Sequence, residues 1–234
     1  MTHIHIDHAG GAGTALRDTP RARVLAHSQA LRHLADPAKL WEASLETLGD
    51  LALQYGRIEP VPKDRLAAAT DLMSIDLGRG QVLEVHLTPG HSPHHLSLFD
   101  RKNGILISGE AAGVCINGIV RLATPPPFKL EEILSSIDWL IALEPKTLCY
   151  GHFGCYDDAV GRLRLVRSKL LTWHEIVSLA VREGKDQEQV ISLLREKDQS
   201  LCYLDSLDEP TYRREHTFLL NSINGLSLSA RGTG

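Results

Sequence analysis

Four residues near the start of the chain are of types that bind metal ions. His3, His5, Asp7 and His8 form a His-x-His-x-Asp-His cluster that runs into a glycine-rich segment. Residues two apart in an extended segment point to the same side, so His3 and His5 can bind one ion. Asp7 and His8 lie past the expected bend and can face a second ion. Imidazoles and carboxylates are ligands of zinc, iron and manganese. A histidine-rich surface terminus or a tag is the alternative interpretation.

Three further candidate ligands each follow a predicted strand. His91 lies in a sharp turn after the apolar strand predicted at residues 81–87. Glu110 follows the strand at residues 105–108, and His152 lies in a glycine-flanked loop after the strand at residues 147–150. Strand ends present functional groups at the edge of a sheet. Any one of these residues alone is more often structural. Three of them beside the opening cluster favour a shared site, in which the two oxygens of Glu110 can bridge two ions.

Short strands followed by helices must position these residues. A helix is predicted from Asp36-Pro37 to about Tyr55, and another at residues 130–143. Beyond about residue 157 the spacing predicts only helices, one of them capped by Asp186 and another running from Pro210 to about Gly225. The predicted strands lie at residues 23–26, 72–77, 81–87, 95–100, 105–108 and 147–150. We expect an α/β (α+β) fold with a catalytic domain at residues 1–157 and a helical extension at residues 158–234.

The composition is that of an ordinary globular protein. The apolar fraction is 43%, the charged fraction 23% and the net charge −4, so neither nucleic acid nor an anionic membrane is an expected partner. No apolar run approaches the roughly 18 residues of a membrane-spanning helix, and the start lacks a secretory signal pattern. No CxxC spacing occurs, so we predict reduced thiols in a cytoplasmic enzyme for all four cysteines: Cys115, Cys149, Cys155 and Cys202.

Taken together, the candidate segments resemble the metallo-β-lactamase superfamily, and more closely its glyoxalase II-like hydrolases. The matching segments are residues 2–11, 88–93, 108–110 and 150–152, in the order of that family. The resemblance implies that the first metal is bound by His3, His5 and His91, and the second by Asp7, His8 and His152. The family usually bridges its two ions with an aspartate. Glu110 stands in that place and would bridge the ions, bind one of them, or tune which metal is held.

The resemblance also implies an αββα sandwich. Members of the family normally have β-strands before the first ligand motif, whereas the motif here begins at position 2. We therefore expect a sandwich that lacks much of the usual N-terminal half-sheet. The sequence is then a shortened version of a longer protein, has a mis-assigned start, or has a truly abbreviated first half-sheet. In the last case an exposed sheet edge would follow, and homodimerisation would be one way to cover it.

The activity implied is that of a binuclear metal-dependent hydrolase acting on a small molecule. Two divalent ions, zinc first with iron or manganese as alternatives, would lower the pKa of a bridging water from about 16 towards about 7. The metal-bound hydroxide would attack a thioester, ester or lactone, with Asp7 and His8 as catalytic residues. His94 and His95 are expected to orient the metal ligands or to pack beside them. Phe128 is expected to form a wall of the substrate pocket. The alternatives are a phosphodiesterase of the same fold and a catalytically inactive metal-binding or interaction fragment.

Overall fold

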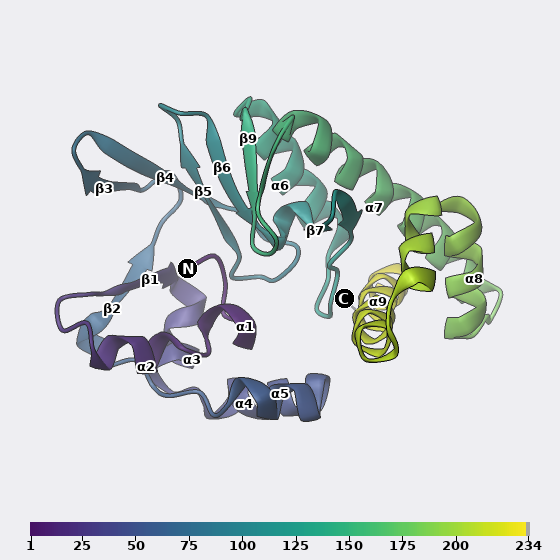
Figure 1. Ribbon diagram of the computed structural model, residues 1–234, viewed down its shortest axis with the longest axis horizontal. Coiled ribbons are helices and arrows are strands. Elements are labelled where there is room, and N and C mark those ends of the chain that lie inside the picture. Colours follow the sequence, from purple (N-terminus) through teal and green to yellow (C-terminus); the bar gives the residue numbers. More distant parts are fainter. Residues whose placement is uncertain (233–234) are drawn as a thin grey trace. The chain divides into compact units, whose positions relative to one another are not determined.

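The computed structural model describes residues 1–232 and has the mixed α/β architecture that the sequence predicts (Figure 1). The chain divides into two compact units. The N-terminal unit comprises Met1–Leu87 and His94–Lys102, and the C-terminal unit comprises Thr88–Pro93 and Asn103–Gly234, of which the last two residues lie outside the described part. The boundary predicted at residue 157, between a catalytic domain and a helical extension, remains a prediction. No helix within residues 1–232 is both long and apolar enough to span a membrane.

Two groups of strands form the sheets of the N-terminal unit. β3 (Ser74–Gly78), β4 (Gln81–Leu87) and β5 (Leu96–Asp100) pair antiparallel, close to the predicted positions. A separate parallel pair joins β1 (Val24–His27) to β2 (Leu66–Ala69). β2 was missed because its sequence, Leu-Ala-Ala-Ala, has a stronger helix than strand propensity, and only its pairing with β1 makes it a strand.

Short helices complete this unit around a small apolar core. They are α1 (Ile6–Ala9), α2 (Ala12–Arg17), η1 (Ser28–Ala30), α3 (Leu31–Ala35) and η2 (Lys63–Arg65). The core contains Ile4, Leu16 and Leu34. The backbone N–H of Leu96 donates to the carbonyl of Thr2 at 2.8 Å, and the ammonium of Met1 donates to the carbonyl of Leu25 at 2.8 Å. The segment that carries His3 is therefore tied to both β5 and β1.

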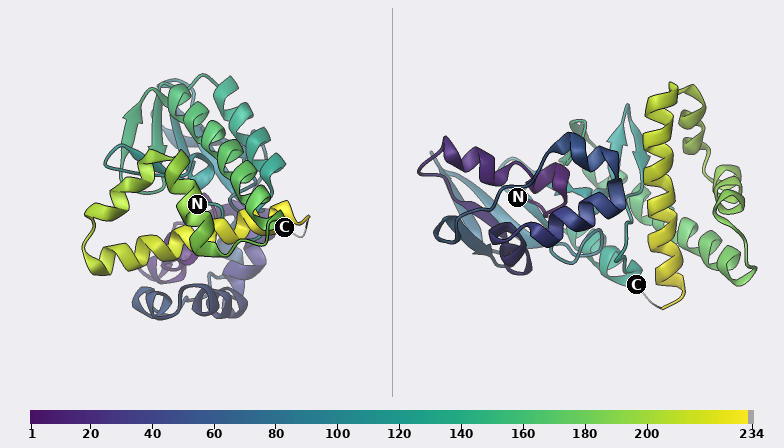
Figure 2. Two further views of the ribbon diagram at one scale, coloured as in Figure 1. Left: turned by 90° about the vertical axis from the view of Figure 1, so that its right-hand side faces the viewer. Right: turned by 90° about the horizontal axis from the view of Figure 1, so that it is seen from below.

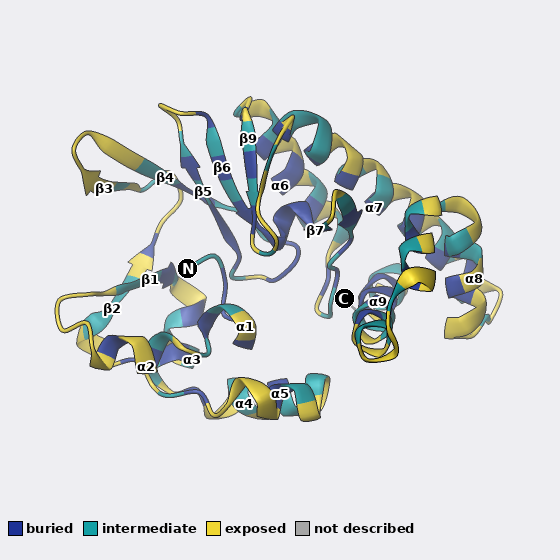
Figure 3. Ribbon diagram, in the orientation of Figure 1, coloured by how far each residue is buried: buried dark blue, intermediate teal, exposed yellow. Residues whose placement is uncertain are grey.

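The single helix predicted up to Tyr55 is wrong. The structure has two helices, α4 (Ala38–Leu48) and α5 (Asp50–Tyr55), separated by Gly49 with φ 54° and ψ −127°. Glycine adopts this conformation without the steric cost that a Cβ imposes. Apolar spacing continues across the break, and an isolated glycine is tolerated within helices, so the sequence pattern alone indicated no boundary. Both helices are exposed along much of their surface (Figure 3).

Two of the candidate ligands follow strands of the C-terminal unit. β6 (Ile105–Gly109) pairs parallel with β9 (Thr147–Tyr150), and β9 pairs antiparallel with β10 (Cys155–Asp157), which the sequence analysis missed. η3 (Glu110–Ala112) follows β6, and β7 (Val114–Ile116) and β8 (Ile119–Arg121) form a hairpin. α6 (Leu130–Ala142) and α7 (Ala159–Arg182) pack against each other beside these strands (Figure 1). Leu106, Leu148 and Ile137 are fully buried in this unit.

The remaining helices pack against α7. α8 (Gln187–Lys197) begins with the predicted capping box of Asp186 and Gln189, and η4 (Gln199–Ser206) follows it. α9 (Glu209–Ala230) packs against α7, and Figure 2 shows it beside α8. The predicted end of this helix at Gly225 is wrong. A Cβ at Gly225 would lie 1.9 Å from the carbonyl oxygen of Thr124, so this glycine serves close packing rather than helix termination.

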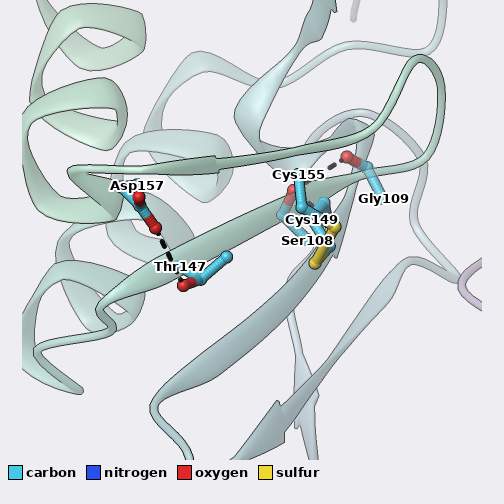
Figure 4. Close-up of a disulfide and its surroundings, with 6 residues drawn as sticks. All are labelled: Ser108, Gly109, Thr147, Cys149, Cys155 and Asp157. Atoms are coloured by element: carbon cyan, nitrogen blue, oxygen red, sulfur yellow. Dashed lines mark hydrogen bonds between the residues drawn. A yellow bond between two sulfur atoms is a disulfide. The ribbon is translucent and has the colours of Figure 1, made fainter.

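The prediction of four reduced thiols is also wrong, because Cys149 and Cys155 form a disulfide (Figure 4). The two residues are direct cross-strand partners of β9 and β10. Their pairing needs no CxxC spacing, since the antiparallel register alone brings their Cβ atoms together. Cys115 is a buried thiol and Cys202 an exposed one. The cytoplasmic location was predicted from unpaired cysteines, and the disulfide removes that argument.

Removing this disulfide is expected to lower the free energy of unfolding by roughly 2 kcal/mol, since the bond closes a short loop with a sequence separation of 6. Urea unfolding of the Cys149→Ser/Cys155→Ser variant tests this value. Cys202→Ser is the matched control and should leave the unfolding midpoint in place. A double variant as stable as the unaltered protein under oxidising conditions would contradict the bond.

Candidate metal centre

The opening cluster is assembled within the N-terminal unit. Nε2 of His3 lies 3.1 Å from Nδ1 of His5, and the ring centroids of His3 and His8 lie 4.4 Å apart. Oδ2 of Asp7 lies 3.4 Å from Nε2 of His8. His3 is buried, whereas Asp7 is exposed. Three imidazoles and one carboxylate thus gather within six residues of chain.

Local sequence explains this gathering. Residues 1–4 are irregular in structure and His5 has φ −59° and ψ 151° as the residue before α1, so His3 and His5 share one side of the segment. Ile4 and Ile6 alternate with the histidines and are 3% and 4% exposed. α1 then turns the chain, with the N–H of His8 donating to the carbonyl of His5 at 3.0 Å. The alternation therefore places Ile4 and Ile6 on the side that packs into the core, and His3 and His5 on the opposite side.

The separation of the His3 and His5 nitrogens fits two ligands of one ion. Metal–nitrogen bonds of about 2.0–2.1 Å in a tetrahedral site place two nitrogens about 3.3 Å apart. Nδ1 of His3 lies 3.1 Å from the hydroxyl of Thr2, a partner that can orient a ligating imidazole. These donors have the type and spacing that a first-row divalent ion requires.

His91 is held in one tautomer in the C-terminal unit. Its Nδ1 lies 2.9 Å from the carbonyl oxygen of Ala123. A carbonyl oxygen only accepts, so Nδ1 carries the proton and Nε2 carries the lone pair that can bind a metal. His91 is 5% exposed, and this hydrogen bond also sets the orientation of its ring.

The turn that carries His91 depends on a close approach to α6. Gly90 has φ 136°, and a Cβ there would lie 2.4 Å from Cβ of Ile133. The hydroxyl of Ser136 donates to the carbonyl of Pro89 at 2.8 Å. The glycine of the Thr-Pro-Gly-His segment is thus required by packing, which holds the turn before His91 against α6.

Glu110 and His152 meet in the same unit. Glu110 follows Gly109, which has φ 52° and turns the chain out of β6. Oε1 of Glu110 lies 3.1 Å from Nε2 of His152, in the loop between β9 and β10, and the Glu110 side chain is 4% exposed. A carboxylate buried this deeply needs a compensating positive charge, from a protonated imidazole or a cation. A divalent cation bound by both side chains would supply this charge.

His94 and His95 lie beside the opening cluster in the N-terminal unit. The ring centroid of His95 is 5.2 Å from that of His3, and that of His94 is 6.4 Å from it. His95 is fully buried, and His94 is half-buried. His95 therefore packs against a candidate ligand.

A group of contacts around Arg162 was not anticipated from the sequence. The guanidinium of Arg162 lies 4.1 Å from the ring centroid of Tyr156, and its Nη1 donates to Sγ of Cys115 at 3.5 Å. Burial raises the pKa of Tyr150 to about 12, so its hydroxyl is protonated at neutral pH. The contact of Arg162 with Cys115 joins α7 to β7, across 47 residues of sequence. Phe128, the expected pocket wall, is 0% exposed and belongs to the core.

Comparison with known proteins identifies the family. Residues 1–152 match the family model of the metallo-beta-lactamase superfamily. The chain belongs to this superfamily. Its members bind divalent metals and are typically metal-dependent hydrolases.

Two curated proteins are similar to this chain. The metallo-beta-lactamase fold-containing protein ST1585 of Sulfurisphaera tokodaii is 33% identical over 158 residues, which cover 66% of this chain and 59% of that protein. The uncharacterized protein YobT of Bacillus subtilis is 28% identical over 160 residues, 65% of each protein. The chain thus spans about three fifths to two thirds of the lengths of these relatives.

Solved structures agree with the superfamily fold. The crystal structure of the archaeal protein ST1585 superposes with a TM-score of 0.64 at 30% identity, covering 74% of this chain and 65% of that one. The metallo-beta-lactamase family protein TTHA1429 of Thermus thermophilus superposes with a TM-score of 0.66 at 23% identity, covering 99% and 73%. The second likeness shows the fold alone.

Proposed function

We propose that this chain is a binuclear metal-dependent hydrolase that cleaves a thioester, ester or lactone. The observation that carries the proposal is the 3.1 Å separation of the His3 and His5 nitrogens in a member of this superfamily. His3, His5 and His91 would hold the first ion, and Asp7, His8 and His152 the second. Glu110 would bridge the ions or serve one of them. Zinc is the metal that we assign first, with iron and manganese as alternatives.

The residues of the chain prepare the site before substrate arrives. When bound, the two ions supply Lewis-acid chemistry, polarising the substrate carbonyl and acidifying a water molecule. Thr2 and Ala123 orient the rings of His3 and His91, so little reorganisation is needed for ligation. Asp7 has a side chain that is 29% exposed, with Oδ2 towards His8. Its Oδ1 is the acceptor that we assign to orient the attacking water.

A metal analysis beside a substrate panel tests this function. The protein is loaded with zinc, iron(II) or manganese and assayed on an acyl thioester, a lactone and bis-nitrophenyl phosphate. We expect two ions per chain and turnover of the thioester or lactone, lost with a chelator and restored with metal. Turnover of the phosphodiester alone would instead make the protein a phosphodiesterase. A chain that binds no metal would be an inactive fragment.

A further inference from the structure

The loop between β9 and β10 exposes a phenylalanine in a conformation that this residue rarely adopts. Phe153 has φ 66°, and its side chain is 63% exposed. The left-handed region is unfavourable for residues with a Cβ, and asparagine or glycine is usual there. Phe153 directly follows His152, and their ring centroids are 6.0 Å apart. A strained, exposed aromatic ring beside a candidate metal ligand points to a role in binding.

The loop is closed covalently at its base. Cys149 and Cys155 flank it, and their disulfide joins β9 to β10 (Figure 4). The N–H of Tyr150 donates to the carbonyl of Gly154 at 3.1 Å, which closes the loop a second time. The position of Phe153 is therefore maintained by its supports rather than by burial of its own ring.

The outer strand of this hairpin is also attached to α7. Nε of Arg162 donates to the carbonyl of Asp157 at 3.2 Å, and its guanidinium stacks on the ring of Tyr156. A ring presented by such an anchored loop loses little conformational freedom when a ligand binds.

A single exposed apolar residue is common on protein surfaces and by itself means nothing. Leu72 shows this, since it has φ 58° and is 58% exposed in the turn before β3. No candidate ligand adjoins Leu72 in sequence. Phe153 differs because its ring lies next to the imidazole of His152, which is proposed to bind the second metal ion. Leu72 is therefore a matched control for exposure and backbone conformation.

We propose that Phe153 is a specificity-determining residue that contacts the apolar acyl chain of the substrate. The inference rests on the proposed hydrolase function, because the acyl chain extends from the carbonyl carbon that is attacked. An aromatic ring offers apolar surface to this chain but no hydrogen bond to a polar leaving group. Phe153 therefore favours longer acyl groups over acetyl.

The kinetic test compares acetyl and octanoyl thioesters of one thiol. Phe153→Asn keeps a residue that tolerates the left-handed region and removes the ring. We expect kcat/KM for the octanoyl thioester to fall roughly tenfold, mainly through KM, while that for the acetyl thioester changes less than about twofold. Phe153→Leu should retain most of the kcat/KM for the octanoyl thioester, and Leu72→Asn should change kcat/KM for neither thioester. An equal loss for both thioesters, or an unchanged preference, overturns the inference.

A binding measurement separates this inference from the proposed function. Titration calorimetry compares octanoate with acetate on the metal-loaded protein and on Phe153→Asn with equal metal content. We expect octanoate to bind about tenfold more weakly to the variant, with acetate unchanged. If the unaltered protein binds metal but hydrolyses no thioester, ester or lactone, the proposed function fails. Weaker binding of octanoate to Phe153→Asn would then still support contact between this ring and an apolar chain, whereas equal binding to both proteins overturns that contact.

Discussion

Replacing His8 by alanine is expected to lower kcat/KM by at least about 10³-fold. A catalytic metal ion contributes several kcal/mol to stabilisation of the transition state, and each 1.4 kcal/mol is about tenfold in rate. His8 lies with its ring centroid 4.4 Å from that of His3, and its Nε2 faces Asp7 at 3.4 Å. Removing its imidazole should therefore also lower the bound metal towards one ion per chain, measured by elemental analysis.

His174 provides the matched control for this experiment. It is also a half-buried histidine, and it lies on α7. Burial lowers its pKa. It is not a candidate metal ligand. His174→Ala is expected to retain both ions and turnover. If His8→Ala kept full metal content and turnover, the assignment of His8 to the second ion would be wrong.

Replacing Glu215 by alanine is expected to destabilise the fold by about 3 kcal/mol. Oε2 of Glu215 accepts from Nη1 of Arg121 at 2.7 Å and from the hydroxyl of Tyr203 at 3.0 Å. The two side chains of the ion pair are only 4% and 12% exposed. Loss of the carboxylate leaves a largely buried guanidinium without its counter-charge, and β8 loses its ionic link to α9. Urea unfolding measures the change.

An exposed ion pair on the same helix is the control for burial. Nε of Arg213 lies 2.7 Å from Oε1 of Glu209, but these side chains are 77% and 67% exposed. Glu209→Ala should change the free energy of unfolding little, because solvent screens such pairs and ordering two long side chains costs entropy. Equal destabilisation by both substitutions would show that burial of the Arg121–Glu215 pair does not decide the cost of breaking it.

Much of the fold could be predicted because its signals are local. The strands ending near Leu87, Asp100 and Tyr150 have alternating apolar residues bounded by turn residues, and the structure has them there. The capping box of α8 is likewise a contact between residues three apart. Prediction failed where distant segments decide the outcome. β2 exists only through its pairing with β1, and α9 passes through Gly225 because Thr124 approaches it.

The sequence by itself determined the chemical types and order of the candidate donors, and the grouping of His3, His5, Asp7 and His8, since that grouping follows from alternation and one helical turn. Only the tertiary structure decided the tautomer of His91, the burial of Glu110 against His152, the disulfide below that loop and the exposed ring of Phe153. The physical reason is that the proton position of His91 and the burial of Glu110 are set by groups tens of residues away, whose approach no local pattern encodes. The disulfide spans only six residues, but it depends on the antiparallel register of β9 and β10.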